Sequence, residues 1–257
     1  MRRQIVASLT VLLGLTLPLG CGYPLAVTGI SQLFFRDQAN GSLIYSHAKL
    51  VGSALLGQSF TDSKGNPLPQ YFQPRPSAAG ASGYDGAASG ASNLGPSNPL
   101  LVGFVAGVNT VGLNGEPSAT NPFATAADPA CVPLDLAGNP VTSPVPGQRF
   151  LKTAAGAYEC DPNTVPERTV AFRLFNGMAP TAAVPVDAVT ASASGLDPDI
   201  SVANALDQAP RVARVRHLPA SQVIALVRQY TTGSEWGFLS ESTVNVLKLN
   251  LALEGLR

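Results

Sequence analysis

Apolar residues dominate the first 35 positions of the chain and then give way to a mixed pattern. From Ile5 to Phe35 no Asp, Glu, Lys or Arg occurs. A membrane-spanning helix needs about 20 apolar residues, so this run is long enough to cross a bilayer. We therefore predict a transmembrane helix over residues 5–35, preceded by a short segment, residues 1–4.

A cleaved leader is the alternative for the same stretch. A signal peptide has an apolar core of about 7–15 residues followed by a cleavage site, whereas here the apolar positions continue through Leu25 and Ile30. The segment "LPLGC" is similar to a lipoprotein cleavage box ending at Cys21, although Pro18 stands where such a box usually has a Leu-like residue. The continuing apolar pattern favours the uncleaved anchor, with a lipoprotein or signal peptide as the other reading.

The charges that flank the apolar run predict its orientation. Arg2 and Arg3 precede the run, while Arg36 just after it is offset by Asp37. Cytoplasmic flanks of membrane helices carry an excess of Arg and Lys. The N-terminus should therefore be cytoplasmic, and residues 36–257 should be extracytoplasmic.

Helical periodicity appears in the last third of the chain. Within Val165–Met178, the apolar residues Val170, Leu174 and Met178 recur every four positions, as they do on one face of a helix. Gly177 supplies a stop signal near the end of this segment. We predict a helix here.

Further helices are predicted after Ser201, whose hydroxyl is a suitable N-cap. We expect Pro210 to end the first of them, and a separate short helix, "RVARVRH", to follow with its arginines on the polar side. Pro219 then begins "PASQVIALVRQYT", in which Pro occupies an early helical position and the apolar residues follow helical spacing.

Strand-like patterns complete the outer part. Short mixed runs bounded by Gly and Pro, at Gly52–Phe60 and Tyr71–Ala79, predict strands. Apolar and polar residues alternate in "TVNVLKLNLALE", residues 243–254, which predicts a half-buried strand. The predicted fold class is α+β: one N-terminal transmembrane helix followed by a single extracytoplasmic α+β domain.

A long irregular insertion is predicted at about residues 106–162. This stretch is rich in Pro, Gly, Asn and Thr and shows no helical period. Structureless segments of this length are uncommon inside compact domains, so it is either functional or disordered. Because the extracytoplasmic side is oxidising, Cys131 and Cys160 are a candidate disulfide; two free thiols in a mobile loop are the alternative.

Composition removes several classes of function. The 16 basic residues balance 16 acidic ones, and charged residues make up only 12% of the chain, so there is no basic field to attract nucleic acid. The two histidines and three scattered cysteines show no metal-ligand spacing. We expect no metal site and no nucleic-acid partner.

The near-motifs in the chain lack the groups that would do chemistry. "GSALLGQS" has P-loop spacing, but Gln58 stands where the phosphate-binding Lys is required. No HExxH, no GxSxG and no phosphorylatable Asp-Lys-Thr-Gly is present. We therefore predict no catalytic residues and no catalysis by this chain alone.

Eight short segments, taken in order, resemble one protein family. They are "YPLAVTGISQLFF", "QANGSLI", "GSALLGQSF", "YFQPRPSA", "ASNLGPSN", "VPVDAVTASASGLDPDIS", "QAPRVARVR" and "GFLSESTVNVLKLNLAL". Together they resemble the C subunit of the Kdp potassium-transporting ATPase, over residues 1–104 and about 163–257. The family usually has a much shorter connection in between, so the insertion is a departure from its pattern.

The resemblance implies an accessory, assembly-stabilising subunit of an ATP-driven potassium uptake complex in the bacterial plasma (inner) membrane. The implied partners are a channel-like potassium-translocating subunit, a P-type ATPase subunit and a small single-helix subunit. The family has also been suggested to raise the nucleotide affinity of the ATPase subunit. A free-standing, membrane-anchored outer-surface binding module or lipoprotein is the alternative function.

The resemblance also nominates site residues. Ser194, Gly195 and Gln208 would read a nucleotide, with ATP shared with the ATPase subunit, but the predicted orientation places them away from cytoplasmic ATP. The structural reading is that Gly195 permits close backbone approach, Asp197 turns the chain and Ser201 caps a helix. Candidate structural or subunit-contact residues are Gly22, Pro24, Gly29, Asn93, Gly95, Asp197 and Ser201.

Small residues in the membrane segment point to companions in the bilayer. Gly22, Gly29 and other glycines let neighbouring helices approach closely, which drives association in lipid. Pro18 and Pro24 free backbone carbonyls that a lone helix in hydrocarbon would leave unsatisfied. We predict that this helix packs against partners and is more than a tether.

Overall fold

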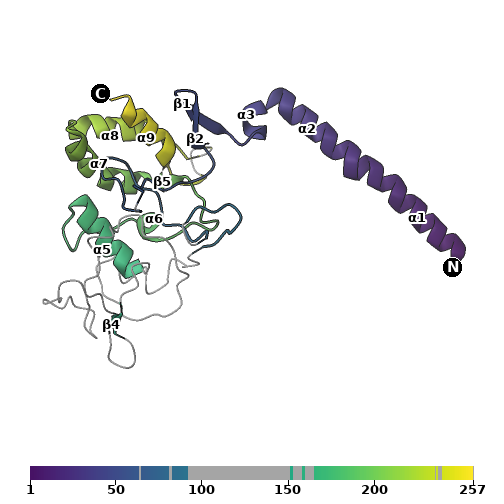
Figure 1. Ribbon diagram of the computed structural model, residues 1–257, viewed down its shortest axis with the longest axis horizontal. Helices are drawn as coiled ribbons and strands as arrows, with labels where there is room; N and C mark the ends of the chain where they lie inside the picture. Colours follow the sequence, from purple (N-terminus) through teal and green to yellow (C-terminus); the bar gives the residue numbers. More distant parts are fainter. Residues whose placement is uncertain are drawn as a thin grey trace. The chain divides into compact units, whose positions relative to one another are not determined.

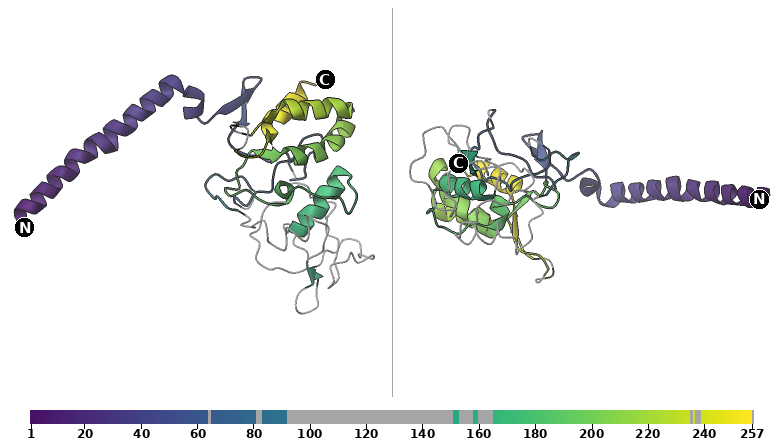
Figure 2. Two further views of the ribbon diagram at one scale, coloured as in Figure 1. Left: turned by 180° about the vertical axis from the view of Figure 1, so that it is seen from behind. Right: turned by 90° about the horizontal axis from the view of Figure 1, so that it is seen from below.

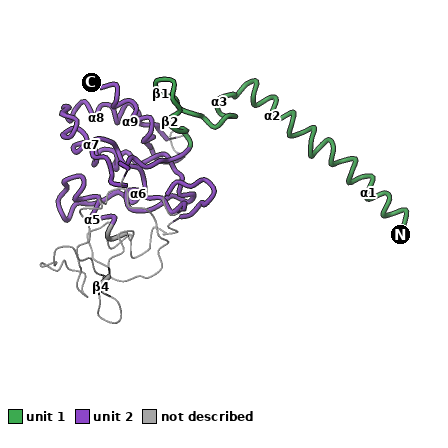
Figure 3. Tube along the Cα trace, in the orientation of Figure 1, with its two compact units in different colours: residues 1–55 green, residues 56–257 purple. Residues whose placement is uncertain are grey.

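The structure, a computed structural model, covers the chain in several described stretches. These are residues 1–63, 65–80, 83–91, 151–152, 158–159, 165–234, 236 and 239–256. Figure 1 shows their helices and strands. They fall into two compact units, Met1–Leu55 and Leu56–Arg257, coloured separately in Figure 3, and each unit is described by itself.

The first unit begins with one long helix, none of whose residues is buried. It comprises α1 (Arg2–Leu17), a five-residue π-helical turn, η1 (Pro18–Gly22), and α2 (Tyr23–Phe34). Within the described part of the chain, it is the one helix long and apolar enough to cross a membrane. The π turn begins at Pro18 and is followed by Pro24, and the missing N–H donors of these prolines disturb the regular ladder.

A short helix and a hairpin complete the first unit. After α3 (Arg36–Ala39), β1 (Leu43–Ser46) and β2 (Lys49–Ser53) pair antiparallel. The register shifts by one residue between Ile44 and Tyr45, so β2 carries a bulge. The unit therefore holds the predicted membrane helix together with the first hairpin of the predicted outer part.

The second unit is built around a small antiparallel sheet and three helices. The strands β5 (Asp199–Ser201), β6 (Thr231–Thr232) and β7 (Thr243–Asn245) lie in the order β5-β7-β6. The helices are α7 (Val202–Arg216), α8 (Ala220–Gln229) and α9 (Val246–Glu254). Helix α7 packs on α8, and α8 packs on α9 (Figure 2).

The core of the second unit gathers the apolar faces of these elements. It contains Phe72, Ile200, Ala205, Ala209, Val212, Ala213, Val223, Leu226, Val227, Val244, Val246, Leu249 and Leu253. A smaller cluster joins α5 (Val165–Asn176) to α6 (Val186–Val189). The predicted α+β class, with an N-terminal helix that could span a membrane, is confirmed.

The predicted helix at 165–178 is confirmed, and it ends as expected. Gly177 adopts a φ of +68°, the left-handed conformation typical of the residue after a helix. The Met178 N–H bonds back to the Arg173 carbonyl at 2.8 Å. Leu174, however, is exposed, and the buried face carries Ala171 and Phe172 instead. Val170 and Met178 pack against this buried cluster, so the helix was predicted correctly and its apolar face was wrong only at Leu174.

The predicted strand at Tyr71–Ala79 is wrong, although the segment is buried. Phe72 and Gln73 are fully buried, yet no residue of this segment belongs to a helix or strand. Two prolines explain this, because they lack the N–H that a strand ladder needs. Side chains replace the ladder: Asn250 bonds both the N–H and the carbonyl of Phe72, each at 2.9 Å.

Gln208 does the same for the next residue of this segment. Its Oε1 accepts from the Gln73 N–H at 2.7 Å, and its Nε2 donates to the Gln73 carbonyl at 3.0 Å. Two carboxamides thus act as short strand mimics. The strand predicted at Gly52–Phe60 is also wrong beyond Ser53, where β2 ends.

Two predictions near the C-terminus need correction. The predicted strand over 243–254 is wrong beyond Asn245, whose side chain accepts from the Lys248 N–H and caps helix α9. Leucine at every second position fits a strand, but burial follows helical spacing through Leu249 and Leu253. Pro210 does not end a helix either, since α7 continues through it to Arg216.

The insertion expected at about 106–162 lies mostly outside the described residues. The exceptions are β3 (Leu151–Lys152) and β4 (Tyr158–Glu159), which pair antiparallel.

The Asn250 contact predicts a strong stability effect. Asn250→Ala removes both partners of the buried Phe72 backbone, so the free energy of unfolding should fall by about 2–4 kcal/mol. Lys248→Ala, on the exposed face of the same helix, is the control and should change it by less than about 0.5 kcal/mol. Urea unfolding of the full chain in detergent, followed by circular dichroism, measures both. Equal stability of the two variants would contradict the clamp.

Candidate functional site

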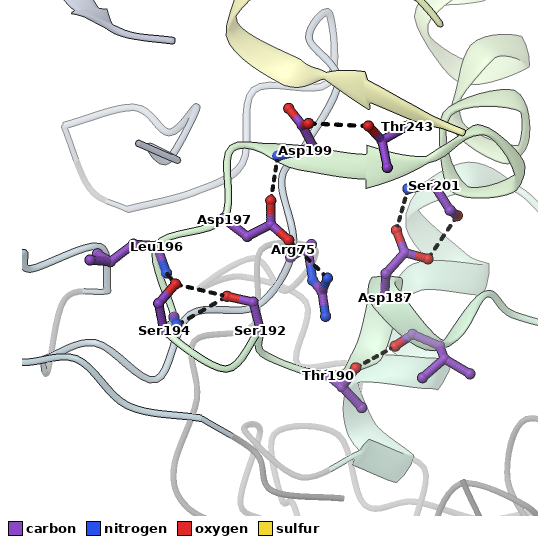
Figure 4. Close-up of polar contacts among 12 residues, drawn as sticks. Arg75, Asp187, Thr190, Ser192, Ser194, Leu196, Asp197, Asp199, Ser201 and Thr243 are labelled. Carbon is purple, nitrogen blue, oxygen red and sulfur yellow. Dashed lines mark hydrogen bonds and ion pairs between the residues drawn. The ribbon is translucent and has the colours of Figure 1, made fainter. Parts of the chain in front are cut away.

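The candidate site is the segment from Thr190 to Ser201, which consists of the loop after α6 and strand β5 (Figure 4). Two serine hydroxyls fold back onto the loop's own backbone. The Gly195 N–H donates to Ser192 Oγ at 3.0 Å, and the Leu196 N–H donates to Ser194 Oγ at 3.1 Å. Short hydroxyl side chains stabilise turns in this way, so the run of small residues shapes the loop.

Gly195 is required by its surroundings. Its φ is +70°, and a Cβ added there would lie 2.6 Å from the Gly90 carbonyl oxygen and 2.9 Å from the Ala79 nitrogen. Both obstacles are backbone atoms, which cannot swing away. The Gly195 carbonyl also accepts from the buried Ser77 hydroxyl at 2.6 Å. The structure therefore accords with the close-approach reading of this glycine.

Neighbouring segments are bonded to the same loop. Ser194 O accepts from Gly90 N at 3.2 Å and from Ser89 Oγ at 2.9 Å. Leu196 O accepts from Gly57 N at 2.8 Å. Segments from three parts of the sequence therefore converge here through backbone contacts.

Asp197 turns the chain and pairs with an arginine. Its Oδ1 accepts from the Asp199 N–H at 3.0 Å, and its Oδ2 lies 3.1 Å from Arg75 Nη1. Both side chains are partly exposed, so this ion pair contributes little to stability. The Arg75 carbonyl accepts the Tyr84 hydroxyl, and burial raises the pKa of Tyr84.

Ser201 caps α7, as predicted from the sequence. Its Oγ accepts from the Asn204 N–H at 3.1 Å. Asp187, which the sequence did not single out, adds three contacts: it accepts from Ser201 N at 2.7 Å, Ser201 Oγ at 2.8 Å and Asn204 Nδ2 at 3.0 Å. Burial and then the Asp187 charge raise the pKa of the nearby Asp207.

Gln208 is fully buried, and every hydrogen-bonding position of its carboxamide is used. Besides Gln73, its Nε2 donates to Asn204 Oδ1 at 2.9 Å, and its Oε1 accepts from Arg211 Nη2 at 2.9 Å. A carboxamide offers two donors and two lone pairs, so none is left for a ligand in this conformation. Ser194, in contrast, is exposed.

Arg211 corrects the prediction that the arginines of this helix lie on its polar side. It is 1% exposed and donates to Asn176 Oδ1, to Gln208 and to the carbonyls of Pro69 and Tyr71. Burial lowers its pKa to about 9, which leaves the guanidinium charged at neutral pH. This arginine therefore ties α7 to the segment before Phe72.

The remaining site residues fall into two groups. Asn93, Gly95, Cys131 and Cys160 lie outside the described residues. Gly22, Pro24 and Gly29 lie exposed on the long helix, and a Cβ added at Gly29 would meet nothing within 4 Å. In the described stretches, no group of three or more His, Cys, Asp or Glu side chains could hold a metal ion.

Comparison with known proteins identifies the family. The sequence profile described as "KdpC: K+-transporting ATPase, c chain" matches residues 5–137 and 160–255. This chain belongs to the KdpC family. The resemblance inferred from the eight short segments is thus confirmed, and KdpC is a subunit of the multi-subunit Kdp potassium ATPase complex.

Several KdpC relatives match along the whole chain. A potassium-transporting ATPase KdpC subunit of Mycobacterium tuberculosis (strain ATCC 25618 / H37Rv) is 41% identical over 256 residues, covering 100% of both chains. The KdpC subunit of Polaromonas naphthalenivorans (strain CJ2) is 42% identical over 257 residues, covering 100% of this chain and 97% of the relative. The stretch at about 106–162 is therefore matched in these KdpC relatives and is not peculiar to this chain.

Gly195 yields a prediction with a built-in control. Gly195→Ala adds both left-handed strain and a clash with backbone, so the free energy of unfolding should fall by about 2–5 kcal/mol. Gly65→Ala has a similar φ, +83°, with nothing within 4 Å, and should cost only about 1–2 kcal/mol. Thermal unfolding of the two variants separates the cost of the left-handed backbone from the cost of the clash. If they are equally destabilised, close approach is not the reason for Gly195.

Proposed function

We propose that this KdpC subunit stabilises the assembly of a potassium-uptake ATPase. Its long helix would pack among the membrane helices of the complex, and its second unit would lie outside the cytoplasm. The proposed partners are the channel-like subunit, the P-type ATPase subunit and the small single-helix subunit, as the family implies. The proposed location is the bacterial plasma membrane, with the N-terminus cytoplasmic.

The observation that supports this role is that the long helix buries none of its residues against the described part of its own unit. No residue of Arg2–Phe34 is buried. The glycines at Gly14 and Gly29 have open space where a Cβ would stand. Because small residues allow close helix packing in lipid, these positions fit contacts with other subunits. A plain anchor has no need of them.

A role in nucleotide affinity is a separate proposal. Of the three nominated residues, only one has a side chain that a nucleotide could contact. Gln208 is buried and fully bonded, and the Gly195 N–H is bonded to Ser192. Ser194 alone of the three nominated residues presents an exposed side chain. A nucleotide shared with the ATPase subunit would therefore be read through Ser194, and only if this loop faced the cytoplasm.

The orientation can be tested with a thiol label. Ser221→Cys places a thiol on the exposed start of α8, in a background with the three native cysteines replaced by serine. An impermeant thiol reagent should label it in intact spheroplasts, because the arginines before the span favour a cytoplasmic N-terminus. Labelling only after lysis would show that the second unit lies in the cytoplasm, where contact with ATP is possible. Full-length protein retained after alkaline washing excludes a cleaved leader.

The packing role can be tested by replacing the span. A poly-Leu/Ala segment in place of Ile5–Ile30 keeps the length and the anchoring, but should abolish co-purification with the other subunits and potassium-stimulated ATP hydrolysis. Gly22→Leu and Gly29→Leu should weaken both partially. Val27→Leu is the matched control and should leave them intact. A chimera that assembles and pumps normally would show that the helix is only an anchor.

A further inference from the structure

The hairpin that follows the membrane helix leaves one apolar face open. Leu43, Tyr45 and Leu50 are 44%, 61% and 50% exposed. Tyr45 pairs with Leu50 across the strands, and Leu43 lies two residues before Tyr45, so the three side chains share one face. On the opposite face, Ile44 and Ser46 are half-buried.

The apolar face formed by these three side chains would gain stability from a covering partner. An isolated two-stranded hairpin is marginally stable in water, and three large apolar side chains left exposed on one face add none of the stabilisation that their burial would give. Within the first unit, no described residue covers this face, as the exposed fractions of its side chains show. The hairpin is therefore suited to an apolar or interfacial environment.

Hydrogen bonds hold α3 back against the end of the membrane helix. The side chains of Gln32 and Asn40 bond each other twice, at 3.2 and 3.3 Å. Asn40 Nδ2 also donates to the Arg36 carbonyl at 2.7 Å. Because Gln32 lies in the last turn of α2, this clamp keeps Asn40 at the level of the end of the span.

The base of the hairpin is pinned to the same point. Ser53 Oγ donates to the Gly41 carbonyl at 2.7 Å, and the Ala54 N–H donates to the Ser42 carbonyl at 2.9 Å. Gly41 and Ser42 directly follow the clamped Asn40. A span inserted with its N-terminus in the cytoplasm therefore places the hairpin at the outer surface of the bilayer.

We propose that the face formed by Leu43, Tyr45 and Leu50 binds the interfacial region of the outer lipid leaflet. Tyrosine is enriched at this depth, where its ring is apolar and its hydroxyl meets headgroups. The hairpin cannot lie in the hydrocarbon core, since the backbone groups at its unpaired strand edges would be unsatisfied there. The inference rests on the proposed insertion of the span with a cytoplasmic N-terminus, and not on which subunits surround it.

Tryptophan fluorescence tests the proposal on the full chain. Trp236 is the chain's one tryptophan, so Trp236→Phe gives a silent background into which Tyr45→Trp is placed. The control is Lys49→Trp, which pairs with Ser46 and so belongs to the opposite face. Each protein is measured alone in phosphatidylcholine vesicles and in the assembled complex, with bromine carried either on upper acyl carbons or near the chain ends.

The expected result is blue-shifted emission for Tyr45→Trp, quenched more by the upper bromines than by the deep ones, with and without the other subunits. Lys49→Trp should emit at longer wavelength and be quenched less. A blue shift without bromine quenching, seen only in the complex, would mean that another subunit covers the face. A blue shift without bromine quenching in the chain alone would mean that the chain's own second unit covers the face. Either outcome, or red-shifted emission throughout, overturns the proposal.

Discussion

Two buried carboxamides hold the second unit together by doing the work of a β-strand partner. The segment around Phe72 and Gln73 passes through the core, but its prolines prevent a regular ladder. Buried backbone groups must nevertheless be satisfied. Asn250 from α9 and Gln208 from α7 supply the missing donors and acceptors, so these helices and the proline-containing segment can only be placed together.

The contacts in this unit assign structural roles to residues that the sequence suggested as binding residues. Gln208 serves the core, Ser201 caps α7 and Gly195 allows backbone segments to meet. These residues shape the second unit. In the described part of the chain, these residues therefore have structural roles, which accords with the accessory role of a KdpC subunit.

Local patterns in the sequence predicted the elements that depend on local physics. The end of α5 just before Gly177 and the cap at Ser201 follow from neighbouring residues alone. The strand predicted over the last leucines was wrong, because their spacing satisfies two periods and only burial chooses between them. The carboxamide contacts were out of reach, since their partners lie 135 and 178 residues apart in the sequence.

The central claim is that Asn250 and Gln208 make the proline-containing segment part of the cooperative core. Native-state hydrogen exchange of the Phe72 and Gln73 amides tests this most directly. Both should exchange as slowly as the buried amides of α7 and open only with global unfolding, because each donates to a buried carboxamide oxygen. Exchange at the rate of an exposed loop, while α7 stays protected, would contradict the account.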